Sequence, residues 1–356
     1  MRMVFRWFGQ GNDRIPLDHI RQIPGVEGVV WALHDVPVGE EWPMEKILEV
    51  KKQTEVYGLN IDVVESVNVH EDIKLGLPTR DKYIENYQKT IEKLAKVGAK
   101  IICYNFMPIF DWTRTDLYKK APDGSTALFF ERGLVENMDP HEMVSKILAD
   151  PTLTMPGWEA ERLKHLSSLF EAYKDVTEEN LWTNLTYFLG KIIPCAEQNG
   201  IKMAIHPDDP PWSIFGLPRI ITNRDNIRRF LDIVDSPYNG VTLCSGSLGA
   251  NLGNNVPALI REFADRIPFA HIRNVRVYKN GNFMETSHRT GDGSVDMYDV
   301  VKAYHENGFT GYARPDHGRH IWDEKCRPGY GLYDRALGVM YIWGIWDSLE
   351  RARQEV

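Results

Sequence analysis

Residues 311–320 read G-Y-A-R-P-D-H-G-R-H and place an acid, two histidines and two arginines directly behind a short apolar run. That run, residues 309–313, is typical of a β-strand, and we expect the ring of Pro315 to end its pairing. Parallel (β/α) barrels carry their chemistry just past the carboxyl ends of the strands. For each of these residues alone the alternative is a charged surface loop. Similar side chains at the ends of other strands would favour a catalytic site over such a loop.

Upstream of this stretch the chain alternates strand-like and helix-like segments. Short β-rich runs occur at residues 3–8, 28–33, 60–64, 100–105, 202–205, 240–243 and 268–272. Between them lie segments with helical patterns, such as residues 42–57 and 81–97, and a last helix is expected at residues 332–350. This β-α-β order predicts parallel strands joined by right-handed crossovers. Together with residues 309–313 it predicts one α/β domain over residues 1–356, a (β/α)8 TIM barrel.

Two segments interrupt the alternation. Residues 106–177 follow the fourth strand and contain D-W-T-R-T-D, several prolines and an expected helix around residues 159–173. We interpret them as an insertion on the catalytic face, where a lid or a partner contact would lie, although packing accounts for most of the aromatic side chains. Residues 275–291 follow the seventh strand, and their polar character predicts a hairpin-like excursion.

The composition restricts the class of protein. A chain of 356 residues with 43% hydrophobic residues can bury a large core, and a net charge of -8 argues against a broad nucleic-acid interface, which needs a basic face. The four cysteines lie far apart without C-x-x-C spacing, which favours a reducing compartment over a disulfide scaffold or a structural zinc site. No apolar run reaches the roughly 18 residues of a membrane span, and residues 1–8 are too short for a signal segment. We therefore expect a cytoplasmic protein.

Four strand ends in the second half of the predicted barrel carry metal-ligand side chains. They are His206, Cys244, His271 and Asp316, at the ends of the fifth to eighth strands. If the barrel closes, neighbouring strands bring two imidazoles, a thiolate and a carboxylate to one rim, a donor set that suits Mn²⁺, Fe²⁺ or Zn²⁺. Taken singly, a buried cysteine is more often a packing residue and a histidine more often a hydrogen-bonded one. The combination of the four therefore predicts the metal site.

Other polar residues at strand ends are weaker candidates. His34, Glu65 and Asn105 end earlier strands, where they would contact substrate hydroxyls or bond within the barrel mouth. Asp208 and Asp209 follow His206 and would either orient the ligand ring or lie in a solvated loop.

Several motifs resemble the D-mannonate dehydratase family. They are M-V-F-R-W-F-G at residues 3–9, A-I-H-P-D-D-P-P at 204–211, L-C-S-G-S-L-G at 243–249, H-I-R-N-V at 271–275 and R-P-D-H-G-R at 314–319. The resemblance implies a xylose-isomerase-like barrel that removes water from D-mannonate to give 2-dehydro-3-deoxy-D-gluconate in hexuronate (glucuronate) catabolism. It also implies Mn²⁺ or Fe²⁺ at His206, Cys244, His271 and Asp316, the set already reached from the strand ends.

Such a dehydration explains the residue types near the expected metal site. A proton next to a carboxylate is weakly acidic and hydroxide leaves poorly, so the site must stabilise an enediolate-like anion and protonate the departing oxygen. A divalent cation can stabilise this anion. Arg314, Arg319 and Arg273 are the arginines nearest to the ligands in sequence, and we predict that they hold the substrate carboxylate.

The proton steps require a second pair of side chains, and the resemblance implies a histidine and a tyrosine. We predict His317, beside the ligand Asp316, and Tyr330 in the segment R-P-G-Y-G-L-Y. Tyr330 is preferred to Tyr333 because it lies in the glycine-flanked loop before the last helix. Which of the two is the acid and which the base stays open.

Two other functions use the same features. A metal-dependent sugar isomerase or epimerase would conserve the mass of the substrate, whereas dehydration loses water. A non-catalytic sugar-acid-binding protein would bind D-mannonate without turnover. The expected partner is the small-molecule sugar acid, with no nucleic acid and no membrane, and we predict a homo-oligomer, a dimer.

Overall fold

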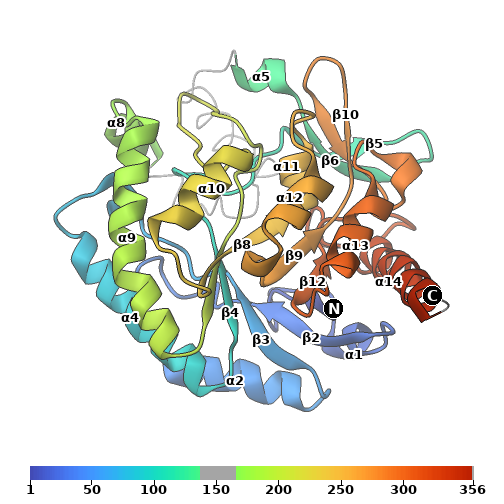
Figure 1. The fold of residues 1–356 in the computed structure, drawn as a ribbon, viewed down its shortest axis with the longest axis horizontal. Coiled ribbons are helices and arrows are strands. Elements are labelled where there is room, and N and C mark those ends of the chain that lie inside the picture. Colours follow the sequence, from blue (N-terminus) through green and yellow to red (C-terminus); the bar gives the residue numbers. More distant parts are fainter. Residues whose placement is uncertain (137–165, 355–356) are drawn as a thin grey trace.

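The structure is a computed structural model, and it describes residues 1–136 and 166–354 of the 356-residue chain. Eight parallel strands close into a barrel (Figure 1). Neighbouring strands follow in the order β1 (Arg2–Arg6), β12 (Tyr312–Pro315), β9 (Phe269–Ile272), β8 (Asn239–Cys244), β7 (Lys202–Ile205), β4 (Ile101–Tyr104), β3 (Asn60–Glu65) and β2 (Val26–Trp31). The predicted (β/α)8 barrel is confirmed.

The barrel interior is filled by side chains. Val4, Val30, Val63, Ile101 and Phe269 belong to one buried cluster, and each comes from a different strand. They point inward because side chains alternate between the two faces of a strand. Since this layer fills the interior, only the ends of the strands remain to line a cavity.

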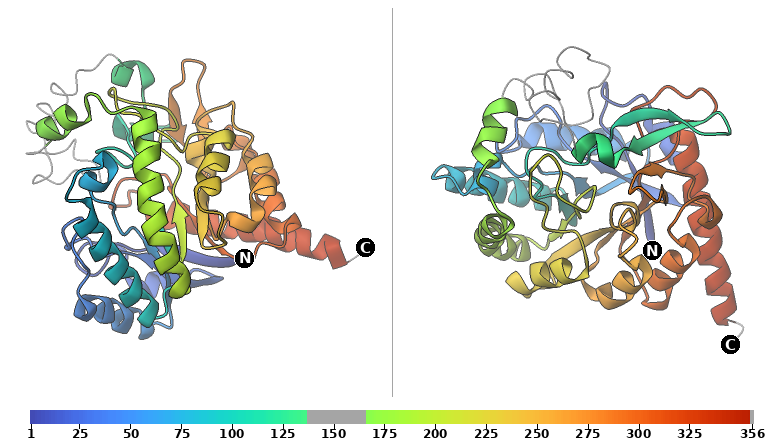
Figure 2. Two further views of the ribbon diagram at one scale, coloured as in Figure 1. Left: turned by 60° about the vertical axis from the view of Figure 1, so that its left-hand side comes forward. Right: turned by 90° about the horizontal axis from the view of Figure 1, so that it is seen from above.

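Helices surround the barrel, and α14 lies at one edge of the molecule in both views of Figure 2. They are α1 (Leu17–Arg21), α2 (Met44–Glu55), α3 (Glu71–Leu75), α4 (Arg80–Lys96), α9 (Glu178–Gln198), α10 (Arg224–Ile233), α11 (Ser245–Gly249), α12 (Val256–Glu262), α13 (Met297–Glu306) and α14 (Leu332–Gln354), with the 3-10 helices η2 (Ala264–Arg266) and η3 (Thr290–Asp292). In α9, Leu181, Leu185 and Ile192 are buried at helical spacing, and Thr177 and Asn180 form a capping box at its start. The spacing of the apolar residues and the capping box thus both stabilise α9.

The two interruptions of the barrel meet in a second sheet. β5 (Asp116–Lys120) and β6 (Thr126–Phe130) come from the insertion, whereas β10 (Val275–Val277) and β11 (Phe283–Glu285) form the hairpin that follows β9. The order is β10-β11-β6-β5, with antiparallel pairing throughout. Figure 1 shows these strands beyond one end of the barrel. Segments more than a hundred residues apart therefore form one layer there.

Two helices complete the described part of the insertion. α5 (Arg132–Glu136) follows β6, and α8 (Leu166–Tyr173) precedes α9. The helix expected around residues 159–173 corresponds to α8 where it is described, and its residues 159–165 lie outside the described residues. Within the ranges 1–136 and 166–354, no helix has both the length and the apolar character needed to cross a bilayer.

The last barrel strand differs from its prediction. β12 begins at Tyr312 rather than at residue 309, and it includes Pro315, which pairs with Ile272 of β9. The amides of Tyr312 and Asp316 donate to carbonyls on the β9 side, so the missing N–H of Pro315 falls on the β1 side. There the register with β1 already ends at Ala313. The next N–H directed at β1 would be that of Pro315, and β12 itself ends at Pro315, so the prediction that this proline ends the pairing is confirmed on the β1 side.

Candidate metal centre and active site

The four predicted metal ligands lie together at the carboxyl rim of the barrel. His206, Cys244, His271 and Asp316 come from the neighbouring strands β7, β8, β9 and β12 or the residues directly after them, and one donor atom from each lies within 4.8 Å of the others. Cys244, His271 and Asp316 are buried. Strand order alone thus brings together side chains that are far apart in the sequence.

The charges around this set suit a cation. Burial alone would raise the pKa of the Cys244 thiol, yet the Arg273 guanidinium and the imidazoles of His206 and His271 hold that pKa well below its ordinary value. The thiolate is the form that binds metals. Burial opposes protonation of His206, but its hydrogen bond to Cys244 raises the pKa of His206 to about 9. The set thus combines a thiolate with imidazoles, donor types that a divalent transition metal takes.

His271 also points a free nitrogen at this site. Its Nδ1 is buried, lies 3.7 Å from Oδ1 of Asp316 and has no hydrogen-bond partner among the described residues. Its other nitrogen, Nε2, lies 3.3 Å from Oε2 of Glu65 and 3.1 Å from Nε of Arg314. A ring proton shared with Glu65 would leave the Nδ1 lone pair for a ligand bond. An unpartnered buried nitrogen next to a thiolate and a carboxylate fits a divalent transition metal.

A neighbouring group, Glu65, Cys103 and His271, has similar spacing but different chemistry. The Arg314 guanidinium already pairs with Glu65, Nη2 to Oε1 at 2.9 Å. Burial raises the pKa of the Cys103 thiol well above its ordinary value, and its sulfur accepts a hydrogen bond from Thr242. An arginine and a protonated thiol leave no place for a second cation there.

The predicted proton-transfer pair lies next to the metal ligands. Nε2 of His317 is 3.0 Å from the hydroxyl of Tyr330, both side chains are buried, and both line a cavity of about 530 Å³ together with His206 and Asp316. Burial, followed by the Asp316 carboxylate, raises the pKa of Tyr330 to about 12. Tyr333 is 43% exposed and does not line this cavity. The geometry therefore favours Tyr330 over Tyr333.

The three predicted arginines have different surroundings. Arg314 lines the cavity and pairs with Asp316, Nη2 to Oδ1 at 2.7 Å. Arg319 pairs instead with Asp334 at the start of α14, at 2.8 Å, and Arg273 is buried behind the ligands. Neither Arg319 nor Arg273 lines the cavity. Proximity in sequence does not bring them to it: Arg319 is held by Asp334 outside the cavity, and Arg273 is held behind Asp209 and Asp316, which do line it.

Two cavity arginines were missed from the sequence. Arg6, the last residue of β1, and Arg327, in the loop before α14, both line the cavity. The strand-end argument that found the metal ligands could have found Arg6 as well. Arg327 follows no strand, so only the folded loop places it there. The weaker candidates His34, Glu65 and Asn105 also line the cavity.

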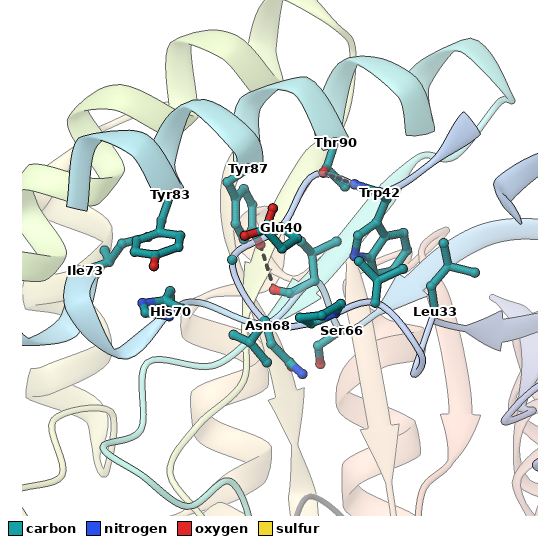
Figure 3. Close-up of a pocket in the computed structure, with 15 residues that line it drawn as sticks. Leu33, Glu40, Trp42, Ser66, Asn68, His70, Ile73, Tyr83, Tyr87 and Thr90 are labelled. Atoms are coloured by element: carbon teal, nitrogen blue, oxygen red, sulfur yellow. Dashed lines mark hydrogen bonds between the residues drawn. The ribbon is translucent and has the colours of Figure 1, made fainter. Parts of the chain in front are cut away.

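A small recess of about 20 Å³ adjoins this cavity, and its polar groups serve the fold (Figure 3). The ring of His70 stacks on Tyr83 with centroids 3.7 Å apart. Tyr87 donates to the carbonyl of Val67 at 3.0 Å, and the hydroxyl of Thr90 accepts from a backbone amide. A space of about one water molecule cannot hold a six-carbon acid.

The family model described as D-mannonate dehydratase (UxuA) matches residues 1–356. The chain belongs to the D-mannonate dehydratase family. It is 70% identical over 355 residues to "Mannonate dehydratase 1" of Bacillus licheniformis, with 100% of this chain and 97% of that protein covered. It is 57% identical to the mannonate dehydratase of Thermotoga maritima, with 99% of each covered. The resemblance inferred from the sequence motifs is thereby confirmed.

Solved structures agree with this family assignment. The crystal structure of mannonate dehydratase from Streptococcus suis serotype 2 superposes with a TM-score of 0.90 at 45% identity, covering 99% of this chain and 96% of that one. A xylose isomerase domain protein from Planctomyces limnophilus, at 11% identity and a TM-score of 0.57, shares the fold. The family thus has a xylose-isomerase-like barrel.

Proposed function

We propose that this member of the D-mannonate dehydratase family is a hydro-lyase that converts D-mannonate to 2-dehydro-3-deoxy-D-gluconate in hexuronate (glucuronate) catabolism. The observation that carries the proposal is the 3.0 Å pair of His317 and Tyr330, which opens into the same cavity as the metal ligands His206 and Asp316. A cavity of about 530 Å³ suits a small sugar acid. The family assignment supplies the substrate.

His206, Cys244, His271 and Asp316 would hold the metal, and we propose Mn²⁺ or Fe²⁺ for this set of two nitrogens, one sulfur and one oxygen. When bound, a divalent cation stabilises the negative charge that develops beside the substrate carboxylate. The chain itself contributes arginines: Arg6, Arg314 and Arg327 line the cavity, and we propose that they hold the carboxylate in place of Arg319 and Arg273.

The two proton steps divide between His317 and Tyr330. A phenol whose pKa is raised to about 12 stays protonated at neutral pH, so Tyr330 can give its proton to the departing hydroxyl. His317 then takes the proton from the carbon next to the carboxylate. The C–H and C–O bonds break, water leaves, and the resulting enol becomes the 2-keto acid.

The decisive experiment incubates the protein with D-mannonate and Mn²⁺ and follows the product by mass spectrometry. We expect a 2-keto acid lighter than the substrate by one water. A product of unchanged mass would instead indicate an isomerase or epimerase, and binding without any product would indicate a sugar-acid-binding protein.

We also propose that residues 1–356 act as one domain, that the protein is a dimer, and that it is cytoplasmic. Cys103, Cys195, Cys244 and Cys326 are all free thiols, which supports a reducing compartment. Light scattering after size exclusion tests the dimer.

A further inference from the structure

Behind His317 lies a buried network of charged groups that the dehydration scheme does not use. Arg114 donates to both oxygens of Asp209, at 2.8 and 3.0 Å, and to Glu285 at 2.7 Å. Arg273 pairs with Asp209 at 2.6 Å and with Glu285. All four side chains are at most 3% exposed. Buried charges of this kind are retained only where partners satisfy them.

His317 is attached to this network by its Nδ1. The nitrogen lies 3.2 Å from Oε1 of Glu285 and 3.0 Å from Nη1 of Arg273, while Nε2 on the other side of the ring faces Tyr330. Burial would raise the pKa of Glu285, but Arg273 and Arg114 lower it to about 2. Glu285 is therefore an ionised acceptor next to the ring.

We propose that Glu285 is a positioning residue for His317: its carboxylate accepts the Nδ1 proton and so directs the Nε2 lone pair toward Tyr330 and the cavity. A histidine is oriented in this way when an acid on one nitrogen fixes the role of the other. The proposal rests on the proposed function, because it assigns Glu285 a part in that reaction.

The second sheet explains how Glu285 reaches this place. Glu285 ends β11, is paired with Val275 of β10 and is 1% exposed. Arg114 precedes β5 in the same sheet. The insertion and the hairpin thus each send one charged residue to the network behind this histidine, and Glu285 alone of the two contacts it.

Arg273 also contacts the groups that surround His317. Its side chain runs past Gly246, where an added Cβ would lie 2.4 Å from Nε of Arg273. Nε lies 2.8 Å from Oδ2 of Asp316, so one guanidinium contacts both the metal-ligand carboxylate and Glu285. Its Nη1 is the rival partner of His317, because donation from Arg273 to Nδ1 would place the ring proton on Nε2.

The test uses Glu285→Gln in the Mn²⁺-loaded enzyme. We expect kcat to fall about 10- to 100-fold with KM for D-mannonate and Mn²⁺ content little changed, because orienting partners act through the residue they hold. In the His317→Asn background the same change should cost almost nothing further, since the positioned ring is gone. An equal loss in both backgrounds would mean that Glu285 only supports the fold, and would overturn the proposal.

The matched control is Asp208→Asn. Asp208 is another buried carboxyl beside an arginine, Oδ1 3.4 Å from Nη1 of Arg219, and it contacts neither His317 nor the cavity. It does not orient His206 either, because its Oδ2 accepts from the amide of Ile221 and Nδ1 of His206 lies 2.6 Å from the carbonyl of Pro207. It should lose stability while kcat stays close to that of the parent enzyme. Should Glu285→Gln fail to fold, the double variant Glu285→Gln/Arg114→Gln removes one charge of each sign and takes its place.

A spectroscopic measurement separates this proposal from the proposed function. In protein loaded with diamagnetic Zn²⁺, the ¹⁵N shifts of the His317 ring, assigned by comparison with His317→Asn, report which nitrogen carries the proton. We expect the proton on Nδ1. A proton on Nε2 with a bare Nδ1 would assign the contact to Arg273 and overturn the proposal. Absence of dehydration by the parent enzyme would instead overturn the proposed function and leave this result standing.

Discussion

Replacing Tyr330 by phenylalanine removes one hydroxyl and little else. The ring stays buried, edge-on to Phe8 with centroids 4.8 Å apart, so its packing is kept. What is lost is the bond at 3.0 Å to Nε2 of His317 and the proton that the phenol would give to the leaving hydroxyl. A positioned general acid contributes about 10²- to 10⁴-fold to a rate, which corresponds to roughly 3 to 5 kcal/mol.

The stability of this variant should change much less than its rate. One net hydrogen bond contributes about 1 kcal/mol, and an acceptor left without a partner costs about 1–3 kcal/mol. The cavity next to both residues can admit water to His317, which keeps the cost at the lower end. We therefore expect a slow enzyme with unfolding behaviour close to that of the parent protein.

Tyr333→Phe is the matched control, because it removes the same atom from a side chain that is 43% exposed and outside the cavity. Steady-state formation of the 2-keto acid, together with thermal unfolding and Mn²⁺ content, measures both variants. Normal turnover by Tyr330→Phe, or equal losses in the two variants, would refute the assignment of Tyr330 as the proton donor.

Three further predictions concern the metal and the buried acids. Cys244→Ser should weaken Mn²⁺ affinity at least about 10-fold and activity with it, because a neutral hydroxyl replaces the thiolate; full activity with normal metal content would remove Cys244 from the ligand set. A chelator should abolish turnover and added Mn²⁺ restore it, whereas activity that survives complete removal would exclude a metal role. Burial would raise the pKa of Glu285, but Arg273 and Arg114 lower it to about 2 from an ordinary 4.5. The ionised Glu285 therefore contributes roughly 3 kcal/mol of stability above pH 4.5, and this contribution is lost as the pH falls toward 2. Denaturant unfolding between pH 6 and pH 3 measures this loss, and Glu285→Gln should flatten the profile; an unchanged profile would contradict it.

The barrel was predictable because its signal is repeated. Each strand is a short apolar run between helices with apolar faces, and an error at one element leaves the others in place. The last strand was predicted at residues 309–313 and lies at Tyr312–Pro315, yet the count of strands and their parallel order did not change. The side to which the proline nitrogen points depends on the register, which the sequence does not specify.

The metal ligands were predictable for a related reason: parallel strands that follow one another round a barrel end at one rim, so ligand-type residues at those ends must meet. The same rule does not extend to Arg319, because it lies in a loop beyond a strand end and is held there by Asp334. Residues that are close in sequence have a predictable position in space only within regular strands and helices.

Glu285 and Arg114 lie outside that rule, since neither belongs to a barrel strand and nothing local distinguishes them from solvated charges. Their position follows from the pairing of β11 with β6, a contact between two irregular segments about 150 residues apart. Only when that second sheet forms do their charges become buried, and Arg114 then pairs with Glu285 while Glu285 contacts His317. A positioning residue such as Glu285 is therefore the hardest part of a site to predict from a sequence pattern. Its role depends on where its own segment folds and also on where the residue that it positions lies.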